Sequence, residues 1–142
     1  MRPRTRLPCS LLQEKILERL NLAVVGTVLE GKVYDQPPEG SPAPACLIGD
    51  MNVKPTGSKT RAELDVTTTL DIYSDAEGYQ EVQALSDGVC QSLTISPLDL
   101  SSQQFRNDDV AFDSLQTSRE FNGTMIRRRA TLVFMWKILD VS

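Results

Sequence analysis

The chain has 142 residues, 40% of them hydrophobic and 24% charged, which is typical of one soluble domain with a sizeable core. Its formal net charge of -4 argues against a dedicated nucleic-acid-binding protein, since such proteins usually carry a basic excess. No apolar run is long enough to span a bilayer, so no membrane partner is expected. Three scattered cysteines favour a reducing compartment over a disulfide framework.

The N-terminal segment is basic and precedes a predicted helix. Residues 1–9 contain three arginines and predict a disordered arm, and residues 10–142 are predicted to form one domain. The helix is expected to begin at Ser10, with Gln13 at the capping-box position. Its apolar face comprises Leu12, Ile16 and Leu20. Gly26 marks a break after this helix.

Two short extended pieces follow, at residues 32–35 and 45–50, and a proline-rich loop separates them. Residues 51–60 follow as a loop, of which residues 54–60 are polar, contain proline and glycine, and lack a clear period. They predict a mobile hairpin tip that becomes ordered against a neighbouring subunit or another protein.

A strand and a helix form the clearest pattern in the chain. Residues 63–72 alternate between polar and apolar side chains, which predicts a strand with one buried face. Ser74 and Glu77 have the spacing of a reciprocal helix cap. The predicted helix then runs to Leu93 and buries Val82, Leu85, Val89 and Leu93. It should fold back onto the apolar face of the strand.

The C-terminal third predicts a connector over residues 98–109 and a strand over 110–121. Asn122 and Gly123 are a strong tight-turn signal, because both tolerate positive φ. In the final strand, residues 125–139, one side is apolar: Ile126, Ala130, Leu132, Phe134, Trp136 and Ile138. The other side also carries apolar residues, more than a solvated face requires: Val133, Met135 and Leu139.

The order helix, strand, strand, helix, strand, strand predicts an α+β fold. We expect an antiparallel sheet of about four to five strands with two helices packed on one face. Each helix is expected to pack its apolar side against the apolar face of the sheet.

No catalytic, cofactor-binding or metal-binding residues are predicted. The chain has no histidine, which removes the commonest general base and the commonest metal ligand together. Residues 26–32 match most of a phosphate-binding loop, but Val33 stands where a magnesium-binding Ser or Thr is needed. Asp108 and Asp109 are adjacent and point to opposite faces of a strand. A small nucleotide-binding or hydrolytic domain therefore remains only a minor alternative.

Charge is unevenly distributed along the chain. Between positions 75 and 113 the sequence has eight acidic residues and one basic residue, Arg106. Three consecutive arginines follow at positions 127–129. Strand alternation places Arg127 and Arg129 on one face and Arg128 on the other. Pairing with acids of the same or a neighbouring copy is favoured over DNA contact. We assign Arg127 and Arg129 to a subunit interface and Arg128 to its own subunit.

Several short motifs, in this order, resemble one family. They are Gly31-Lys32-Val33-Tyr34-Asp35 before the proline-rich loop, Ile48-Gly49-Asp50, Leu70-Asp71-Ile72-Tyr73-Ser74, the helix over residues 78–93 and the strand around residues 128–134. Over residues 10–139 the chain resembles the tail-completion, or tail-terminator, proteins of long-tailed bacteriophages and related gene transfer agents.

The resemblance implies a non-enzymatic subunit of a homomeric ring, commonly a hexamer, at the head-proximal end of the tail. Such a ring stops polymerisation of the tail tube protein and meets the head-side connector or stopper, and DNA only passes through its lumen. The virion would be assembled in the host cytoplasm. The expected subunit or tube interface comprises Lys54, Lys59, Arg61, Arg127, Arg129, Val133 and Met135. The alternative is another head–tail joining protein, such as a connector or stopper.

Overall fold

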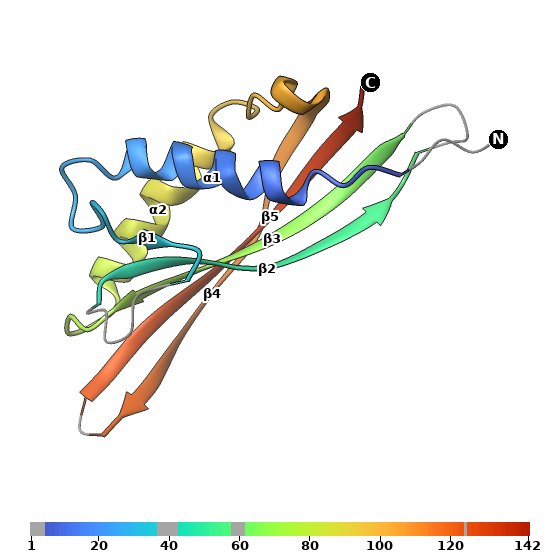
Figure 1. Ribbon diagram of the computed structural model, residues 1–142. Coiled ribbons are helices and arrows are strands. Elements are labelled where there is room, and N and C mark those ends of the chain that lie inside the picture. The colour runs from blue at the N-terminus through green and yellow to red at the C-terminus, as the bar shows by residue number, and fades with distance from the viewer. Residues whose placement is uncertain (1–4, 37–42, 58–61, 124) are drawn as a thin grey trace.

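The computed structural model describes residues 5–36, 43–57, 62–123 and 125–142, and it shows two helices on one face of a five-stranded sheet (Figure 1). The elements in chain order are α1 (Cys9–Ala23), β1 (Val33–Tyr34), β2 (Ala45–Pro55), β3 (Glu63–Ser74), α2 (Gln80–Thr94), a short 3-10 turn η1 (Ser101–Gln103), β4 (Phe105–Asn122) and β5 (Met125–Asp140). The strand order is β1-β2-β3-β5-β4.

The predicted α+β class and the strand number are confirmed, with one difference in strand direction. β1 pairs in parallel with β2, whereas the other three pairings are antiparallel, so the sheet is mixed. β1 has only two residues, Val33 and Tyr34. A strand this short has no side-chain period from which its direction could be predicted.

The one-sided strand is confirmed in β3, where every second residue is buried. β3 pairs along its whole length with β5, and both strands bury their inward residues beneath the helices. Fully buried residues of β5 include Leu132, Phe134, Trp136 and Ile138. Trp136 Nε1 donates a hydrogen bond to Thr68 Oγ1 at 2.9 Å, so the buried indole N–H is satisfied.

Both helices bury the predicted faces, except that Leu85 of α2 is only half-buried, and neither predicted capping box forms. α1 begins at Cys9 and α2 begins at Gln80, and neither helix has a side-chain cap. Ser74 is the last residue of β3, and its hydroxyl donates to Glu81 Oε1 at 2.7 Å and accepts from the Ala76 N–H at 3.2 Å. Because α2 starts later than predicted, the serine contacts the first turn of α2 and does not cap it.

β2 is longer than predicted and replaces part of the expected mobile loop. Residues 51–55 continue the strand and pair with residues 64–68 of β3. Met51 and Val53 pack half-buried against the core and alternate with exposed Asn52 and Lys54, but a bulge between Ile48 and Met51 interrupts the pattern, so the sequence did not indicate one continuous strand. Residues 58–61 of the same predicted loop lie outside the described residues.

β4 also begins earlier than predicted, at Phe105 within the expected connector, and has 18 residues. Its register against β5 shifts between Asn107 and Asp109 and again between Phe112 and Ser114. Such bulges interrupt the alternation from which a strand is recognised. The predicted turn between β4 and β5 is confirmed, with Gly123 at φ 64°.

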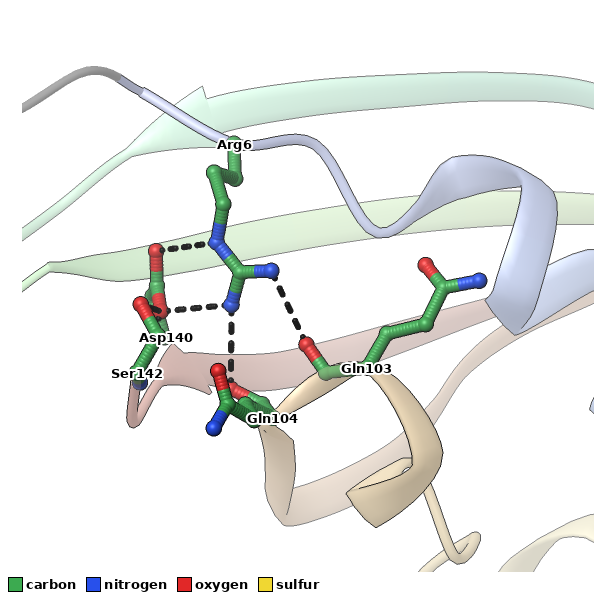
Figure 2. A network of polar contacts seen from close by, with 5 residues as sticks. All are labelled: Arg6, Gln103, Gln104, Asp140 and Ser142. Atoms are coloured by element: carbon green, nitrogen blue, oxygen red, sulfur yellow. Dashed lines mark hydrogen bonds and ion pairs between the residues drawn. The ribbon is translucent and has the colours of Figure 1, made fainter.

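The segment predicted as a disordered arm, residues 1–9, is described from Thr5 onward. At Arg6 the structure differs from that prediction, because the side chain joins a network at the end of the sheet (Figure 2). Residues 1–4 lie outside the described part of the chain, and the domain boundary at residue 10 stays a prediction.

Arg6 contacts the C-terminal end of β5 and the turn before β4. Its Nε and Nη2 donate to both carboxylate oxygens of Asp140, at 3.0 and 2.7 Å. Nη1 donates to the carbonyl of Gln103 at 2.9 Å and Nη2 to that of Gln104 at 3.2 Å. The guanidinium also lies 4.4 Å from the centre of the Phe105 ring. One arginine therefore joins three segments that are distant in sequence.

Arg6→Ala is expected to lower the thermal unfolding midpoint at pH 7, and less so in acid. The hydrogen bond from Arg6, supported by Ser142, holds the pKa of Asp140 well below its usual range. A depressed folded-state pKa stabilises the fold above the ordinary carboxyl pKa of about 4, and this contribution declines as the pH falls below it. Circular dichroism melts at pH 7 and pH 3 measure both differences.

Arg6→Lys is the matched control, because it keeps the positive charge but lacks the planar fork of the guanidinium. We expect its midpoint to lie between those of the parent and Arg6→Ala. An Arg6→Ala loss of the same size at both pH values would contradict the assigned Asp140 pairing.

Candidate interaction surface

The described part of the chain offers no arrangement suited to metal chemistry. Within it, no group of three or more His, Cys, Asp or Glu side chains could hold a metal ion. In the same residues, neither helix is long and apolar enough to cross a membrane.

The segment that partly matches a phosphate-binding loop forms turns after α1, with Leu29 buried and Val28 exposed. A cavity beside it has a volume of about 90 Å³ and an apolar lining that includes Val24, Leu29, Leu85 and Val89. Ligand pockets usually measure about 300–1,000 Å³. The cavity is too small for a nucleotide and offers no charged group to hold phosphate.

Arg127 lies on the face of the sheet opposite the helices and pairs within its own chain. Its Nε and Nη2 donate to the two carboxylate oxygens of Asp75, at 2.9 and 3.2 Å. This hydrogen bond raises the pKa of Arg127. Because the geometry is bidentate, it fixes the direction of the guanidinium more strongly than a single contact would.

Arg129 lies on the same face and joins three strands. Its Nε donates to Asp71 Oδ1 on β3 at 3.1 Å, and Nη1 donates to Glu120 Oε1 on β4 at 3.0 Å. Thr131 Oγ1 donates to the same oxygen of Asp71 at 2.8 Å. The Tyr73 ring lies 5.9 Å from this guanidinium, and burial raises the pKa of the Tyr73 hydroxyl.

Arg128 points to the opposite face, as strand alternation predicted. Its Nη1 donates to the carbonyl of Ala76 at 2.9 Å, and its guanidinium lies 5.6 Å from the centre of the Tyr79 ring. Its Nε is buried without a hydrogen-bond partner among the described atoms. Arg128 therefore contacts its own subunit, at the start of α2.

Acids that pair with both arginines are thus available within one chain, and of these only Asp75 belongs to the acidic segment over residues 75–113. Asp75 pairs with Arg127, and Asp71 and Glu120 pair with Arg129. Contact with a second copy is not needed to satisfy either guanidinium. Sequence spacing could not reveal these pairs, because the partners of Arg127 and Arg129 on β3 and after it are more than 50 positions away.

The expected apolar stripe on the outer side of β5 is smaller than predicted. Met135 is exposed and Val133 is half-buried, but Leu139 is only 5% exposed. In register, Leu139 lies between Glu63 of β3 and Arg106 of β4, two long side chains. The stripe is therefore limited to the centre of the sheet.

Lys54 is the one candidate lysine that the structure describes. Lys54 is exposed on β2, in register with Asp65 of β3. Lys59 and Arg61 lie outside the described residues. The structure thus brings Arg127, Arg129, Val133 and Met135 together on β5 and places Lys54 on β2, two strands away.

A larger exposed apolar surface lies on β4, where the sequence pattern indicated none. Phe112, Leu115 and Phe121 are 44%, 42% and 75% exposed. They lie in register with Phe134, Leu132 and Ile126 of β5, on the face that carries the helices. In Figure 1 the tip of the β4–β5 hairpin extends beyond both helices, and the exposed fractions show that the three β4 side chains are covered only in part. We call these three residues the β4 apolar stripe.

The sequence and the fold have counterparts among known proteins. Residues 14–138 match the family described as "Tail completion protein gp17". A chain in the structure "Virion of native gene transfer agent (GTA) particle" has a similar fold, with a TM-score of 0.74 and 24% sequence identity, over 90% of this chain and 94% of that chain. Among curated proteins, none matches.

Proposed function

The chain belongs to the tail completion protein gp17 family and is a structural protein of a phage-type tail, and from this premise we propose that it forms a ring, most simply a hexamer, that ends the tail tube. In this role the ring stops polymerisation of the tube protein and presents its other side to the head-side connector. It is assembled in the host cytoplasm, carries out no chemical reaction and needs no cofactor.

The observation that carries the ring proposal is the β4 apolar stripe. A monomer would expose three large apolar side chains along one strand, which is unfavourable unless another surface covers them. Head-to-tail contacts between identical copies bury such a surface on each copy and close into a ring when the rotation fits.

The paired arginines support a lumen that DNA crosses without being held. Arg127 and Arg129 are neutralised by Asp75, Asp71 and Glu120 on the face without helices. Tight phosphate binding depends on basic side chains that displace counterions from DNA. If this face lines the lumen, its paired charges offer little attraction to a passing duplex.

Particles made without this gene product test the proposal. Tail tubes of uncontrolled length that fail to join heads are expected, and the full chain supplied in trans should restore a uniform length and joining. Tails of normal length that fail to join heads would support the alternative, a connector or stopper. Tails that are normal in both respects would refute both.

The role of Arg127 can be separated from ring formation by a charge exchange. Arg127→Asp places a carboxylate against Asp75 and is expected to lower the free energy of unfolding by about 1 kcal/mol, because the pair is partly exposed. Adding Asp75→Arg should restore the pair, the stability and the ring together. Urea unfolding and electron microscopy of purified tails measure these outcomes.

The exchange also tests the earlier assignment of Arg127 to a subunit interface. If the doubly exchanged protein regains stability but forms no rings, Arg127 must contact a neighbouring copy. If stability and rings both return, the ion pair of Arg127 with Asp75 in the same chain accounts for its contribution to ring formation.

A further inference from the structure

β4 is an edge strand that is exposed over most of its length. It ends the sheet order, and every residue from 111 to 121 is exposed, whichever face its side chain occupies. An uncovered edge presents unpaired backbone N–H and C=O groups and is a template for pairing with another strand. The 18-residue length of β4 makes this edge the longest in the molecule.

The opposite edge of the sheet is also incomplete. β1 pairs only with Cys46 and Leu47, near the start of β2. From Met51 to Pro55, the described residues provide no strand on the outer side of β2. Each copy therefore offers two uncovered edges, one at each side of the same sheet.

The two edges have compatible directions. β2 is antiparallel to β3, β3 to β5 and β5 to β4, so β2 and β4 run in opposite directions. If two copies lie side by side in the same orientation, β4 of one and β2 of the next are antiparallel. This arrangement repeats identically from copy to copy, as a ring requires.

Charge also matches across these edges. Lys54, Asp65, Lys137 and Asp109 occupy successive strands in one register row, so the sign alternates from β2 to β4. In a second copy placed beside β4, the next residue of the row would be Lys54. Opposite charges facing each other on paired strands stabilise the pairing. Neither Lys54 nor Asp109 has an ion pair among the described residues.

We propose that copies of this chain join edge to edge, with β4 of one copy antiparallel to residues 51–55 of the next and Asp109 facing Lys54. The sheet then continues around the ring. This inference rests on the proposed ring and names the surface that forms it. The second copy is the occupant because the complementary edge, direction and charge all belong to this same chain.

The pairing also covers two of the three residues of the β4 apolar stripe, Phe112 and Leu115. The helices and the stripe lie on the same face of the sheet, so the helix layer of the next copy adjoins Phe112 and Leu115. α1 contacts β1 at the joining side, and the end of α1 and the loop after it expose Leu22, Val25 and Val28. These side chains offer an apolar partner surface.

Disulfide cross-linking in purified tails tests the pairing. Asn52 and Ala111 occupy a row two residues from the charged one, on the same face of the sheet, and both are exposed. Directly opposed strand residues have Cβ atoms about 4.5–5.5 Å apart, close enough for a disulfide after modest adjustment. The variants Asn52→Cys, Ala111→Cys and their combination are made in a chain carrying Cys9→Ser and Cys90→Ser, which leaves the buried Cys46.

The double variant should give a ladder of cross-linked multimers that ends at the closed ring. Each single variant should give none, and an equal mixture of the two should give dimers and nothing larger, because each subunit then carries one engineered cysteine. Dimers from Ala111→Cys alone would overturn the proposal in favour of β4 pairing with β4. Cross-links that require Lys54→Cys in place of Asn52→Cys would overturn the stated register.

Charge exchange provides an independent measurement. Asp109→Lys and Lys54→Glu should each reduce the fraction of rings in tail preparations, and the two together should restore it. Asp87→Lys, at an exposed position on α2, is the matched control and should leave rings unchanged. Intact rings without cross-links and without a charge effect would refute the edge pairing alone. Absence of rings from unmodified tails would refute the proposed function as well.

Discussion

Replacing Phe134 by alanine is expected to lower the free energy of unfolding by about 3–5 kcal/mol. The side chain is completely buried at the centre of the sheet. Its ring meets Phe112 edge-on at 5.9 Å between centroids and lies 6.4 Å from the Trp136 ring. Deletion removes apolar contacts and leaves a cavity that the paired strands cannot close. Urea unfolding followed by circular dichroism measures the loss.

Phe121→Ala is the matched control, because it deletes the same atoms from a side chain that is 75% exposed. Its free energy of unfolding should stay within about 0.5 kcal/mol of the parent. Its ring assembly should fall, since Phe121 belongs to the β4 apolar stripe. A similar loss of stability in both variants would show that the assigned core is wrong.

Asn107→Ala is the second substitution expected to have a large effect on stability. The Asn107 side chain is buried at the first β4 bulge, where its Oδ1 accepts from the Leu98 N–H at 3.0 Å. Its Nδ2 donates to the carbonyls of Asp109 and Lys137, at 2.8 and 3.2 Å. This amide therefore fixes both the bulge and the end of the connector.

The expected loss is about 2–4 kcal/mol, because each buried group left without a partner costs roughly 1–3 kcal/mol and three partners are affected. Thermal and urea unfolding provide the measurement. Asn52→Ala removes an exposed amide from β2 and should change stability little. Equal effects from the two variants would contradict the role given to Asn107.

The elements that were predicted well are those whose pattern is local. Alternation in β3 and helical spacing in α2 placed Val66, Leu70, Val82 and Val89 in the core, and all four are buried. A side-chain period of two or about 3.6 residues is repeated within each segment, so the segment itself carries the information.

Errors arose where a neighbouring strand changed the requirement. β2 continues beyond a bulge between Ile48 and Met51, and β4 begins ahead of a bulge between Asn107 and Asp109, and each bulge interrupts the side-chain alternation. The predicted cap at Ser74 failed because that residue ends a strand and contacts Glu81. In each case a contact distant in sequence outweighed a local preference.

The α+β class, the inward residues of the long strands, the opposite directions of Arg128 and its two neighbours, and the family were all predictable from the residues alone. These properties depend on periodicity and on the order of short motifs. The pairing of Arg127 with Asp75, the burial of Leu139, and the exposed edge and apolar stripe of β4 became visible in the folded chain. Strand order, register and coverage by helices fix those properties, and they arise from contacts between segments far apart along the chain.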